Sequence, residues 1–313
     1  MDRIIITGAT SMIGIALIEQ SLEFGTQKIF AVVKPDSTNL NRLPQTNRVV
    51  PVECGVETYD LLPILIKEHC DVFFHFAWAG SRNGSSHEQC SDISNTLSAL
   101  YAAKQLGCKK FIGAGSQGEY GLPDVPQIAP HTPVDPLLPF SIAKYATGKM
   151  VLLEAKAIGM HCFWPRIFSV YGKHDRPNSM INSSLRNLLL GKKVAFTAGE
   201  QLWDFLYCSD AGRAMYLIGE KATGNKVYCI GSGKACLLSE YIKIIGDTLG
   251  ASANIEIGKL PYPPNAIMNL CADITSLTSD TGFYPQVDFN NGIAMTVEFI
   301  KQKMKKKEQL PNV

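Results

Sequence analysis

The stretch from Ile4 to Gly14 constrains the fold of this 313-residue chain more than any other. Ile4-Ile5-Ile6 is a β-branched run typical of a buried strand, and apolar residues then recur at helical spacing from Met12 to Leu22. Gly8 and Gly14 would let the backbone approach closely in the turn between the two elements. A helix N-terminus presents free N–H groups and a partial positive charge, so the pattern predicts that an anion binds over this turn.

The natural anion at such a turn is the pyrophosphate of a dinucleotide. A strand, turn and helix with nothing bound is the alternative, because a pair of glycines alone is a weak signal. The position of the turn at the start of a strand and helix series favours the dinucleotide. The residues expected to line the cofactor here are Gly8, Thr10, Ser11, Met12, Ile13 and Gly14.

Strand and helix patterns alternate through the first half of the chain. Strands are expected at 28–33, 48–52, 71–77, 110–115 and 161–168, and helices at 59–69, 91–106 and 142–158. Strands separated by helix-length segments form right-handed βαβ units, which build a parallel sheet covered by helices on both faces. The predicted fold class is therefore α/β, a Rossmann-type doubly wound parallel sheet, with ligands at the carboxyl ends of the strands.

The alternation weakens after Lys173. Helices expected at 180–190, 210–220, 238–249 and 291–303, with short strands at 193–196 and 226–230, predict a smaller mixed C-terminal substrate lobe that closes over the ligand edge of the sheet. The expected division is a dinucleotide-binding Rossmann domain at 1–172, with returning segments at about 204–232, and a substrate-binding lobe at 173–203 and 233–313.

Composition narrows the classes of partner. The net charge of +2, from 30 basic and 28 acidic residues, gives no electrostatic reason to expect nucleic acid. The sequence has no leader pattern and no apolar run long enough to span a bilayer, so no membrane association is expected. Nine cysteines without a CxxC pair favour free thiols in the cytoplasm and no metal site. The Lys-rich end, 301–307, is expected to be a solvated tail rather than a membrane or partner patch.

The end of the second strand would meet the adenosine ribose of the cofactor. Lys34 stands there with Ser37 nearby, and a basic residue at this place suits the 2′-phosphate of NADP. Asp36 could instead turn toward a free ribose 2′-hydroxyl, which NAD carries. NADP is the predicted cofactor, and NAD stays open.

Six motifs together resemble the extended short-chain dehydrogenase/reductase family of the NAD-dependent epimerase/dehydratase type, whose members modify nucleotide sugars. TGATSMIG resembles its TGxxGxxG cofactor turn, DVFFHFAWAG its fourth strand, GSQGEYG its Ser-x-x-x-Tyr-Gly segment and PFSIAK its Pro-Tyr-x-x-x-Lys motif. PRIFSVYG resembles R-x-F-N-x-Y-G, and GEQLWDFLYCSDAGRAM resembles G-x-Q-x-R-D-F-x-x-V-x-D-x-x-x-A. The likeness spans nearly the whole chain. It implies further cofactor contacts at Ala77 and Ile167, and a homodimer formed through two sheet-flanking helices.

The resemblance also implies a catalytic site. In the family a Tyr gives or removes a proton at the reacting oxygen, the Lys four residues later lowers the pKa of that Tyr, and a Ser hydrogen-bonds the same oxygen. The match places these roles at Ser116, Phe140 and Lys144, with Lys144 also holding the nicotinamide ribose. Phe140 has no proton to give.

Tyr145 and Lys149 offer a second Tyr-x-x-x-Lys register. Pro139 and the small Ala143 favour the register of Phe140 and Lys144 instead. Two explanations of Phe140 stay open: an engineered Tyr-to-Phe change, which the otherwise intact scaffold favours, and a natural loss in which another group gives the proton. In both cases this form is expected to be impaired.

Other departures from the family pattern concern the substrate. Gln117-Gly118 stands where the family's dehydratases carry an Asp-Glu pair, which disfavours dehydration. Trp203 stands where an Arg often clamps the diphosphate of the substrate, so Arg176 or Arg213 would have to replace that Arg. The residues expected to bind substrate are Trp78, Gln117, Ser169, Arg176 and Trp203. His75, inside a buried strand, is expected to be a hydrogen-bonded core residue rather than a catalyst.

The sequence thus predicts an NAD(P)-dependent nucleotide-sugar oxidoreductase. A 4-keto-sugar reductase is favoured because Lys34 suits an exchangeable NADP. A nucleotide-sugar 4-epimerase with retained NAD is the alternative. A non-catalytic nucleotide-sugar sensor is the alternative from another class of protein.

Overall fold

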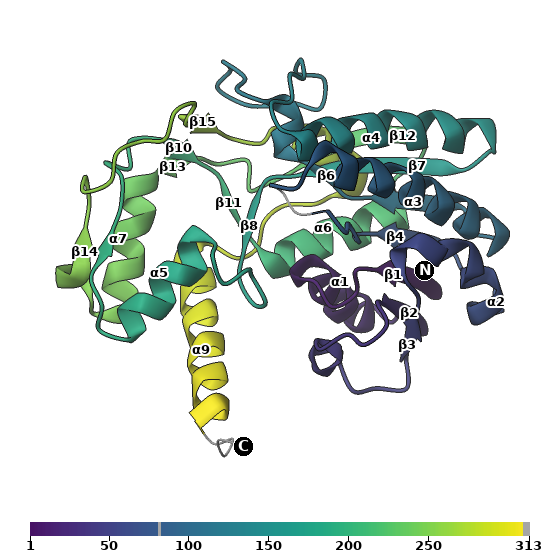
Figure 1. The fold of residues 1–313 in the computed structure, drawn as a ribbon, viewed down its shortest axis with the longest axis horizontal. Coiled ribbons are helices and arrows are strands. Elements are labelled where there is room, and N and C mark those ends of the chain that lie inside the picture. Colours follow the sequence, from purple (N-terminus) through teal and green to yellow (C-terminus); the bar gives the residue numbers. More distant parts are fainter. Residues whose placement is uncertain (81–82, 309–313) are drawn as a thin grey trace.

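A parallel β-sheet organises the larger part of the molecule (Figure 1). The computed structural model describes residues 1–80 and 83–308, with only the backbone for 306–308. The strands are β1 (Arg3–Thr7), β2 (Lys28–Val33), β3 (Val49–Glu53), β4 (Val72–His75), β5 (Lys110–Gly113), β7 (His161–Ile167) and β12 (Asn225–Ile230). They lie in the order β12-β7-β5-β4-β1-β2-β3, every neighbouring pair is parallel, and the short β6 (Gly115–Ser116) pairs with β7. The predicted doubly wound α/β class is confirmed.

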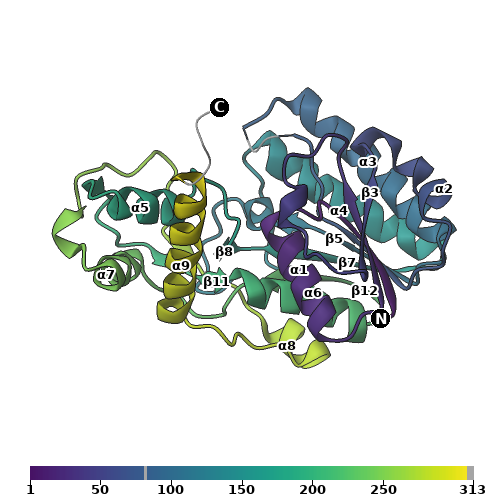
Figure 2. The ribbon, with the colours of Figure 1, turned by 90° about the horizontal axis from the view of Figure 1, so that it is seen from below.

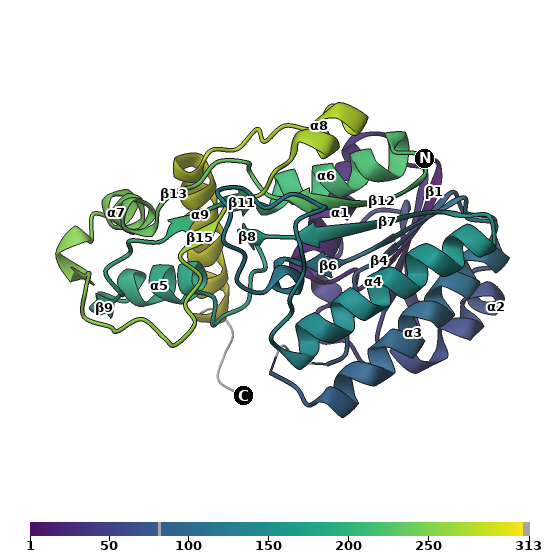
Figure 3. The ribbon, with the colours of Figure 1, turned by 90° about the horizontal axis from the view of Figure 1, so that it is seen from above.

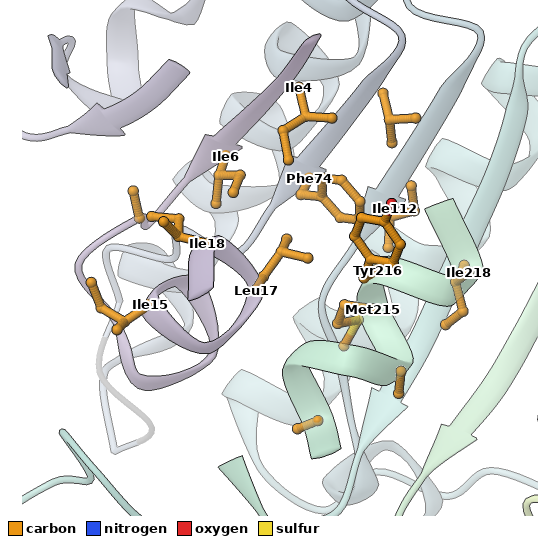
Figure 4. Close-up of a cluster of buried hydrophobic side chains, with 14 of the residues drawn as sticks. Ile4, Ile6, Ile15, Leu17, Ile18, Phe74, Ile112, Met215, Tyr216 and Ile218 are labelled. Atoms are coloured by element: carbon orange, nitrogen blue, oxygen red, sulfur yellow. The ribbon is translucent and has the colours of Figure 1, made fainter. Parts of the chain in front are cut away.

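Helices cover both faces of this sheet. α1 (Met12–Glu23) and α6 (Cys208–Lys221) pack together on one face (Figure 2). α3 (Ser86–Gln105) and α4 (Pro139–Ala157) pack together on the other, with the short α2 (Leu62–Ile66) beside them (Figure 3). The side chains of a strand alternate between the faces, so Ile4 and Ile6 of β1 join the core under α1 and α6 (Figure 4). Ile5 joins the core under α3 and α4.

Several predicted helix boundaries were wrong, for local reasons. The helix expected at 59–69 is a 3₁₀ segment, η2 (Val56–Leu61), followed by α2, which ends where Lys67 takes a left-handed conformation with φ of 56°. α3 begins earlier than expected because Ser85 and Glu88 form a capping box at its N-terminus. The strand expected at 110–115 divides at Ala114 into β5 and β6.

Apart from α6 and β12, most of the chain after β7 forms a smaller mixed lobe beside the sheet (Figure 1). Its helices are α5 (Met180–Leu189), α7 (Leu238–Leu249) and α9 (Phe289–Glu308). The short α8 (Thr275–Thr281) instead packs against α6 and β12 of the larger part (Figure 2). Its short strands are β8 (Ser169–Tyr171) with β11 (Phe205–Tyr207), β9 (Val194–Ala195) with β14 (Ile255–Glu256), and β10 (Leu202–Trp203) between β13 (Cys236–Leu237) and β15 (Asn269–Leu270). Sequence patterns predicted neither α8 nor the short strands β8, β10, β11, β13, β14 and β15.

The structure has three further 3₁₀ segments among the described residues. η1 (Leu40–Arg42) lies between β2 and β3, η3 (Gln117–Tyr120) follows β6, and η4 (Ser252–Asn254) follows α7 in the smaller lobe. The Pro-rich stretch 121–138 contains no helix or strand longer than a single bridge, at Ile128, as its composition predicted. Within the described ranges, no helix is both long enough and apolar enough to cross a membrane.

Candidate active site

The turn between β1 and α1 is tight enough that only glycine fits at two positions. Gly8 has φ of +64°, and a Cβ there would lie 2.8 Å from the backbone N of Ala77. A Cβ on Gly14 would lie 2.5 Å from the carbonyl oxygen of Gly8. Ser11 caps α1, because its side chain accepts a hydrogen bond of 3.1 Å from the Gly14 N–H. The residues present therefore fit a dinucleotide: the turn at Gly8 lies against the chain just after β4, and the N-terminal amides of α1 lie against this turn at the ligand edge of the sheet.

A cavity of about 420 Å³, which we call the turn cavity, begins at this turn. It joins predicted cofactor residues to all three predicted catalytic residues. The predicted residues that line it are Ser11, Met12, Ile13, Trp78, Ser116, Phe140, Lys144, Ile167 and Arg176. Arg42, His174 and Asp175 line it as well, and sequence reasoning missed all three.

Lys144 is held in place at the centre of this cavity, with 5% of its surface exposed. Its Nζ donates a hydrogen bond of 2.8 Å to the carbonyl oxygen of Ala114 and lies 3.7 Å from the centre of the Trp78 ring. The Phe140 ring centre is 5.8 Å from the same Nζ, and Phe140 meets Trp78 edge to face at 6.0 Å. An aromatic ring therefore stands where the family pattern expects a phenol.

Ser116 is positioned by a buried ion pair that the sequence did not reveal. Glu119 is fully buried, and its carboxylate accepts hydrogen bonds from Arg166 Nε at 2.6 Å, Trp164 Nε1 at 3.0 Å and the Ser116 N–H at 2.8 Å. The Ser116 side chain in turn accepts from the Gly118 N–H at 3.2 Å. The backbone of Ser116 is thus fixed by groups on β7.

The alternative register lies outside the turn cavity. Tyr145 lines none of the described cavities, and its ring centre lies 6.0 Å from the guanidinium of Arg166. Lys149 is exposed on α4. Phe140 and Lys144, four residues apart on the same helix, both face the turn cavity.

A second cavity of about 260 Å³, which we call the lobe cavity, lies between β8, α5 and β10. Four predicted substrate residues line it: Gln117, Ser169, Arg176 and Trp203. The Trp203 Nε1 donates a hydrogen bond of 2.9 Å to the Ser169 side chain, so the two are coupled. Arg176 and Asp175 line both cavities, and the lobe cavity therefore adjoins the turn cavity.

Some predicted residues lie elsewhere. Lys34 is exposed, and neither it nor Ser37 lines the turn cavity. Arg213 cannot replace the missing diphosphate clamp, because it is buried on α6 against Asp210 at 2.9 Å and the carbonyl oxygen of Tyr284. That part of the expectation was wrong. Thr10 contributes its carbonyl oxygen, which accepts a hydrogen bond of 3.0 Å from Arg42.

His75 is a core residue, as predicted. Its Nδ1 lies 2.8 Å from the Thr7 hydroxyl and its Nε2 3.2 Å from the Thr96 hydroxyl, which itself donates to the Asp92 carbonyl oxygen. Because Thr96 donates elsewhere, it accepts from His75 Nε2–H, and Nδ1 is the acceptor. Burial, with a contribution from Lys144, lowers the pKa of His75 to about 3, so the ring is neutral.

No cluster of His, Cys, Asp and Glu suited to a metal ion occurs among the residues that the structure describes.

A family model described as the NAD dependent epimerase/dehydratase family matches residues 4–231. The UDP-glucose 4-epimerase of Mycolicibacterium smegmatis is 24% identical over 96% of this chain and 99% of its own length.

Two solved structures illustrate the likeness in fold. The UDP-N-acetylglucosamine 4-epimerase of Methanobrevibacter ruminantium M1, in complex with UDP-N-acetylmuramic acid, has a TM-score of 0.87 at 23% identity and covers 97% of this chain and 99% of its own. The dTDP-glucose 4,6-dehydratase DesIV of Streptomyces venezuelae, with NAD and TYD bound, has a TM-score of 0.85 at 20% identity and covers 97% and 98%. Because the family model spans well over half of the sequence, the chain belongs to the NAD-dependent epimerase/dehydratase family, within the extended short-chain dehydrogenases/reductases.

Proposed function

We propose that this chain is a nucleotide-sugar oxidoreductase that acts as a keto-sugar reductase. The observation that carries the proposal is the pair of adjoining cavities: one runs from the cofactor turn to Ser116 and Lys144, and the other lies beside Trp203. This arrangement suits a nicotinamide cofactor in the turn cavity and a sugar whose nucleotide extends into the lobe cavity.

The cofactor would be held by the turn at Gly8 to Gly14 and by Ala77, Lys144 and Ile167. When bound it supplies the hydride. Ser116 would hydrogen-bond the carbonyl oxygen of the substrate, and the Lys144 ammonium would stabilise negative charge that develops there. Phe140 and Trp78 would keep water away from that oxygen.

Phe140 favours reduction over epimerisation. Oxidation of an alcohol needs a base that removes the hydroxyl proton, and Phe140 offers none next to Ser116 and Lys144. The same group protonates the oxygen in the reverse step, so epimerisation meets the loss of this group twice, in oxidation and in re-reduction, whereas net reduction meets it once. We infer that this form works in the reductive direction at an impaired rate.

A 4-epimerase is the second candidate, and the relatives whose names include a 4-epimerase activity favour it. The two candidates differ in net turnover of the cofactor. The test follows the absorbance of added NADPH or NADH while the protein is supplied with a nucleotide-linked 4-keto sugar, and separately follows interconversion of UDP-glucose and UDP-galactose. A reductase consumes reduced cofactor. Tightly retained NAD with sugar interconversion and no net consumption would overturn the reductase proposal.

The choice between NADP and NAD rests on Lys34. Its exposed side chain at the end of β2 is free to turn toward a 2′-phosphate, which supports NADP. Replacing Lys34 by Ser should weaken NADP binding while leaving NAD binding unchanged in calorimetric titrations. An equal effect on both cofactors would contradict this assignment.

A non-catalytic sensor of nucleotide sugars remains the candidate from another class of protein, and Phe140 is the observation that favours it.

We also propose a homodimer, because Ile142, Met150 and Leu153 form an apolar stripe along the outer face of α4, with Tyr101 of α3 beside it. These four side chains are 44–69% exposed, and contact with a second copy of the chain would remove this apolar surface from water.

A further inference from the structure

A third cavity, of about 170 Å³, lies at the mouth of the cleft, and we call it the cleft-mouth pocket. Four segments line it: Arg42 of η1, the loop at 172–177 after β8, Asn182 and Arg186 of α5, and the Phe299–Met304 turn of α9. α5 and α9 lie side by side in the smaller lobe (Figure 2). The volume is on the order of five or six water molecules, so the pocket suits a small polar group rather than a whole nucleotide.

Positive charge dominates the described lining of this pocket. Arg42, Arg186 and Lys303 contribute guanidinium and ammonium groups, and Asp175 is the one carboxylate. The two oxygens of Asp175 already accept hydrogen bonds from the Arg176 N–H at 2.6 Å and the Ser179 hydroxyl at 2.5 Å. Within the described residues, no carboxylate lies within ion-pair distance of Arg42 or Arg186.

His174 points to what the pocket lacks. Its Nδ1 is buried and has no hydrogen-bond partner among the described atoms, and its ring meets Phe299 edge to face at 4.8 Å. Burial, and then Lys303, Arg42 and Lys173, lower the pKa of His174 to about 4. A buried nitrogen without a partner costs free energy, and an acceptor placed beside the cations would allow His174 to be protonated and to donate.

The backbone of His174 adds a second sign of constraint, since φ is +63° in a residue other than glycine. The pocket also adjoins the cofactor turn: Arg42 lines both cavities and donates to the Thr10 carbonyl oxygen. We propose that the cleft-mouth pocket binds a phosphate dianion, either free or as a phosphate monoester of a larger ligand, between Arg42, Arg186, Lys303 and His174.

The proposal is independent of the reaction that the enzyme catalyses, and its test uses binding alone. Inorganic phosphate is titrated into the full chain by calorimetry at constant ionic strength set with chloride. Arg186→Gln and Lys303→Gln remove exposed cations that line the pocket, and Lys192→Gln and Lys301→Gln are matched controls outside it. Loss of a charged hydrogen bond should weaken phosphate binding roughly tenfold or more in the first pair and leave it unchanged in the second.

The imidazole of His174 gives a second readout, by nitrogen NMR with His174→Gln for assignment. The charged groups that face it are Arg42, Lys173, Asp175, Arg186 and Lys303. Saturating phosphate should raise the His174 pKa, because a dianion offsets the surrounding cations. No saturable binding, equal losses in lining and control variants, or an unchanged His174 pKa would each overturn the proposal.

Two further arms identify the source of the phosphate. If NADP displaces inorganic phosphate competitively and NAD does not, the monoester is the 2′-phosphate of the cofactor, and the assignment of that phosphate to Lys34 is wrong. If phosphate binds equally well to the free protein and to the protein saturated with either dinucleotide, the pocket takes a separate phosphate-bearing ligand. Both results support an anion site, and each identifies a different molecule as the source of the phosphate.

Discussion

Glu119 and Arg166 hold the backbone beneath Ser116 by a charge pair from which water is excluded. Both side chains are almost completely buried, and the Glu119 carboxylate serves three donors. A buried pair contributes little net stability when intact, yet removing one charge leaves the other without compensation. Local sequence patterns gave no sign of it, because the partners are 47 residues apart.

The substitution Glu119→Gln keeps the shape of the side chain and removes its charge. We expect the free energy of unfolding to fall by about 3–5 kcal/mol, since Arg166 then stays charged in an apolar setting. Urea unfolding measures this. Glu298→Gln, on the exposed face of α9, is the control and should change stability by less than about 0.5 kcal/mol. Equal stability of the two variants would show that the pair does not support the site.

His75 makes stability depend on pH. Its folded pKa, about 3, lies below the ordinary value of 6.5, so between these values the unfolded chain binds a proton that the folded chain does not. The stabilising effect of the neutral ring is complete above 6.5 and is lost as pH falls toward 3. The pKa of His174 is also lowered, to about 4, so its contribution to stability is likewise lost as pH falls below the ordinary value.

Replacing His75 by Gln should therefore flatten the acid limb of the stability profile by up to about 1.4 kcal/mol per pH unit. Unfolding titrations between the two pKa values measure the slope, whatever the overall stability of the variant. His87→Gln, at an exposed position, should leave the slope unchanged. A slope that is the same in His75→Gln and wild type would contradict a neutral buried imidazole.

Among the elements, the turn that joins β1 to α1 depends on the absence of a side chain at Gly14. A Cβ there would meet backbone oxygen at 2.5 Å, and backbone cannot rotate away. Gly14→Ala should lower stability by about 1–3 kcal/mol and NAD affinity by roughly tenfold, because the helix end must shift.

Calorimetric titration with NAD and thermal unfolding measure the two effects of Gly14→Ala. Gly55→Ala is the matched control, since its nearest contacts, at 3.3 and 3.4 Å, are the ends of flexible side chains. Both values should be close to wild type in the control. Undiminished NAD affinity in Gly14→Ala would contradict a cofactor that lies over this turn.

The main elements could be predicted because each carries a local signal. β2 and α7 fall at their expected bounds, Lys28–Val33 and Leu238–Leu249, since period and flanking turns agree there. α2 is short because the chain up to Leu61 forms a 3₁₀ segment and Lys67 ends the helix, which periodicity does not report. The two-residue strand β15 exists only through its pairing with β10, a tertiary contact.

The candidate site divides in the same way. Ser116, Phe140 and Lys144 were found from motifs, and their gathering around one cavity followed from strand order. His174 and Asp175 were missed because they follow β8 in a loop whose path depends on the smaller lobe. The misplaced expectation for Arg213 had the same cause, because a helix pattern does not say which neighbour covers which face.

At the scale of the whole molecule, the exposed apolar stripe on α4 predicts self-association. Leu153, 69% exposed, lies in this stripe, and a charge there would be buried without a partner in a dimer. Leu153→Lys should shift the protein from dimer to monomer in light-scattering chromatography. Leu190→Lys at the end of α5, where 56% is exposed, should not. A monomeric wild-type protein would contradict the proposed homodimer.

The division into a dinucleotide-binding domain and a substrate lobe stays a proposal. If it is right, the cofactor and the sugar meet beside Phe140. Restoring the phenol by Phe140→Tyr should leave cofactor binding unchanged and raise the rate of keto-sugar reduction by ~10²–10⁴. Tyr145→Phe, in the other register, should leave the rate unchanged.

The most direct measurement is therefore the initial rate of reduced-cofactor oxidation by wild type and Phe140→Tyr, across a panel of nucleotide-linked keto sugars. The account predicts a slow wild-type rate and a large gain in the Tyr form with at least one of these sugars. If the Phe140→Tyr variant binds cofactor but reduces none of these sugars, the result would contradict the reductase proposal and favour the sensor.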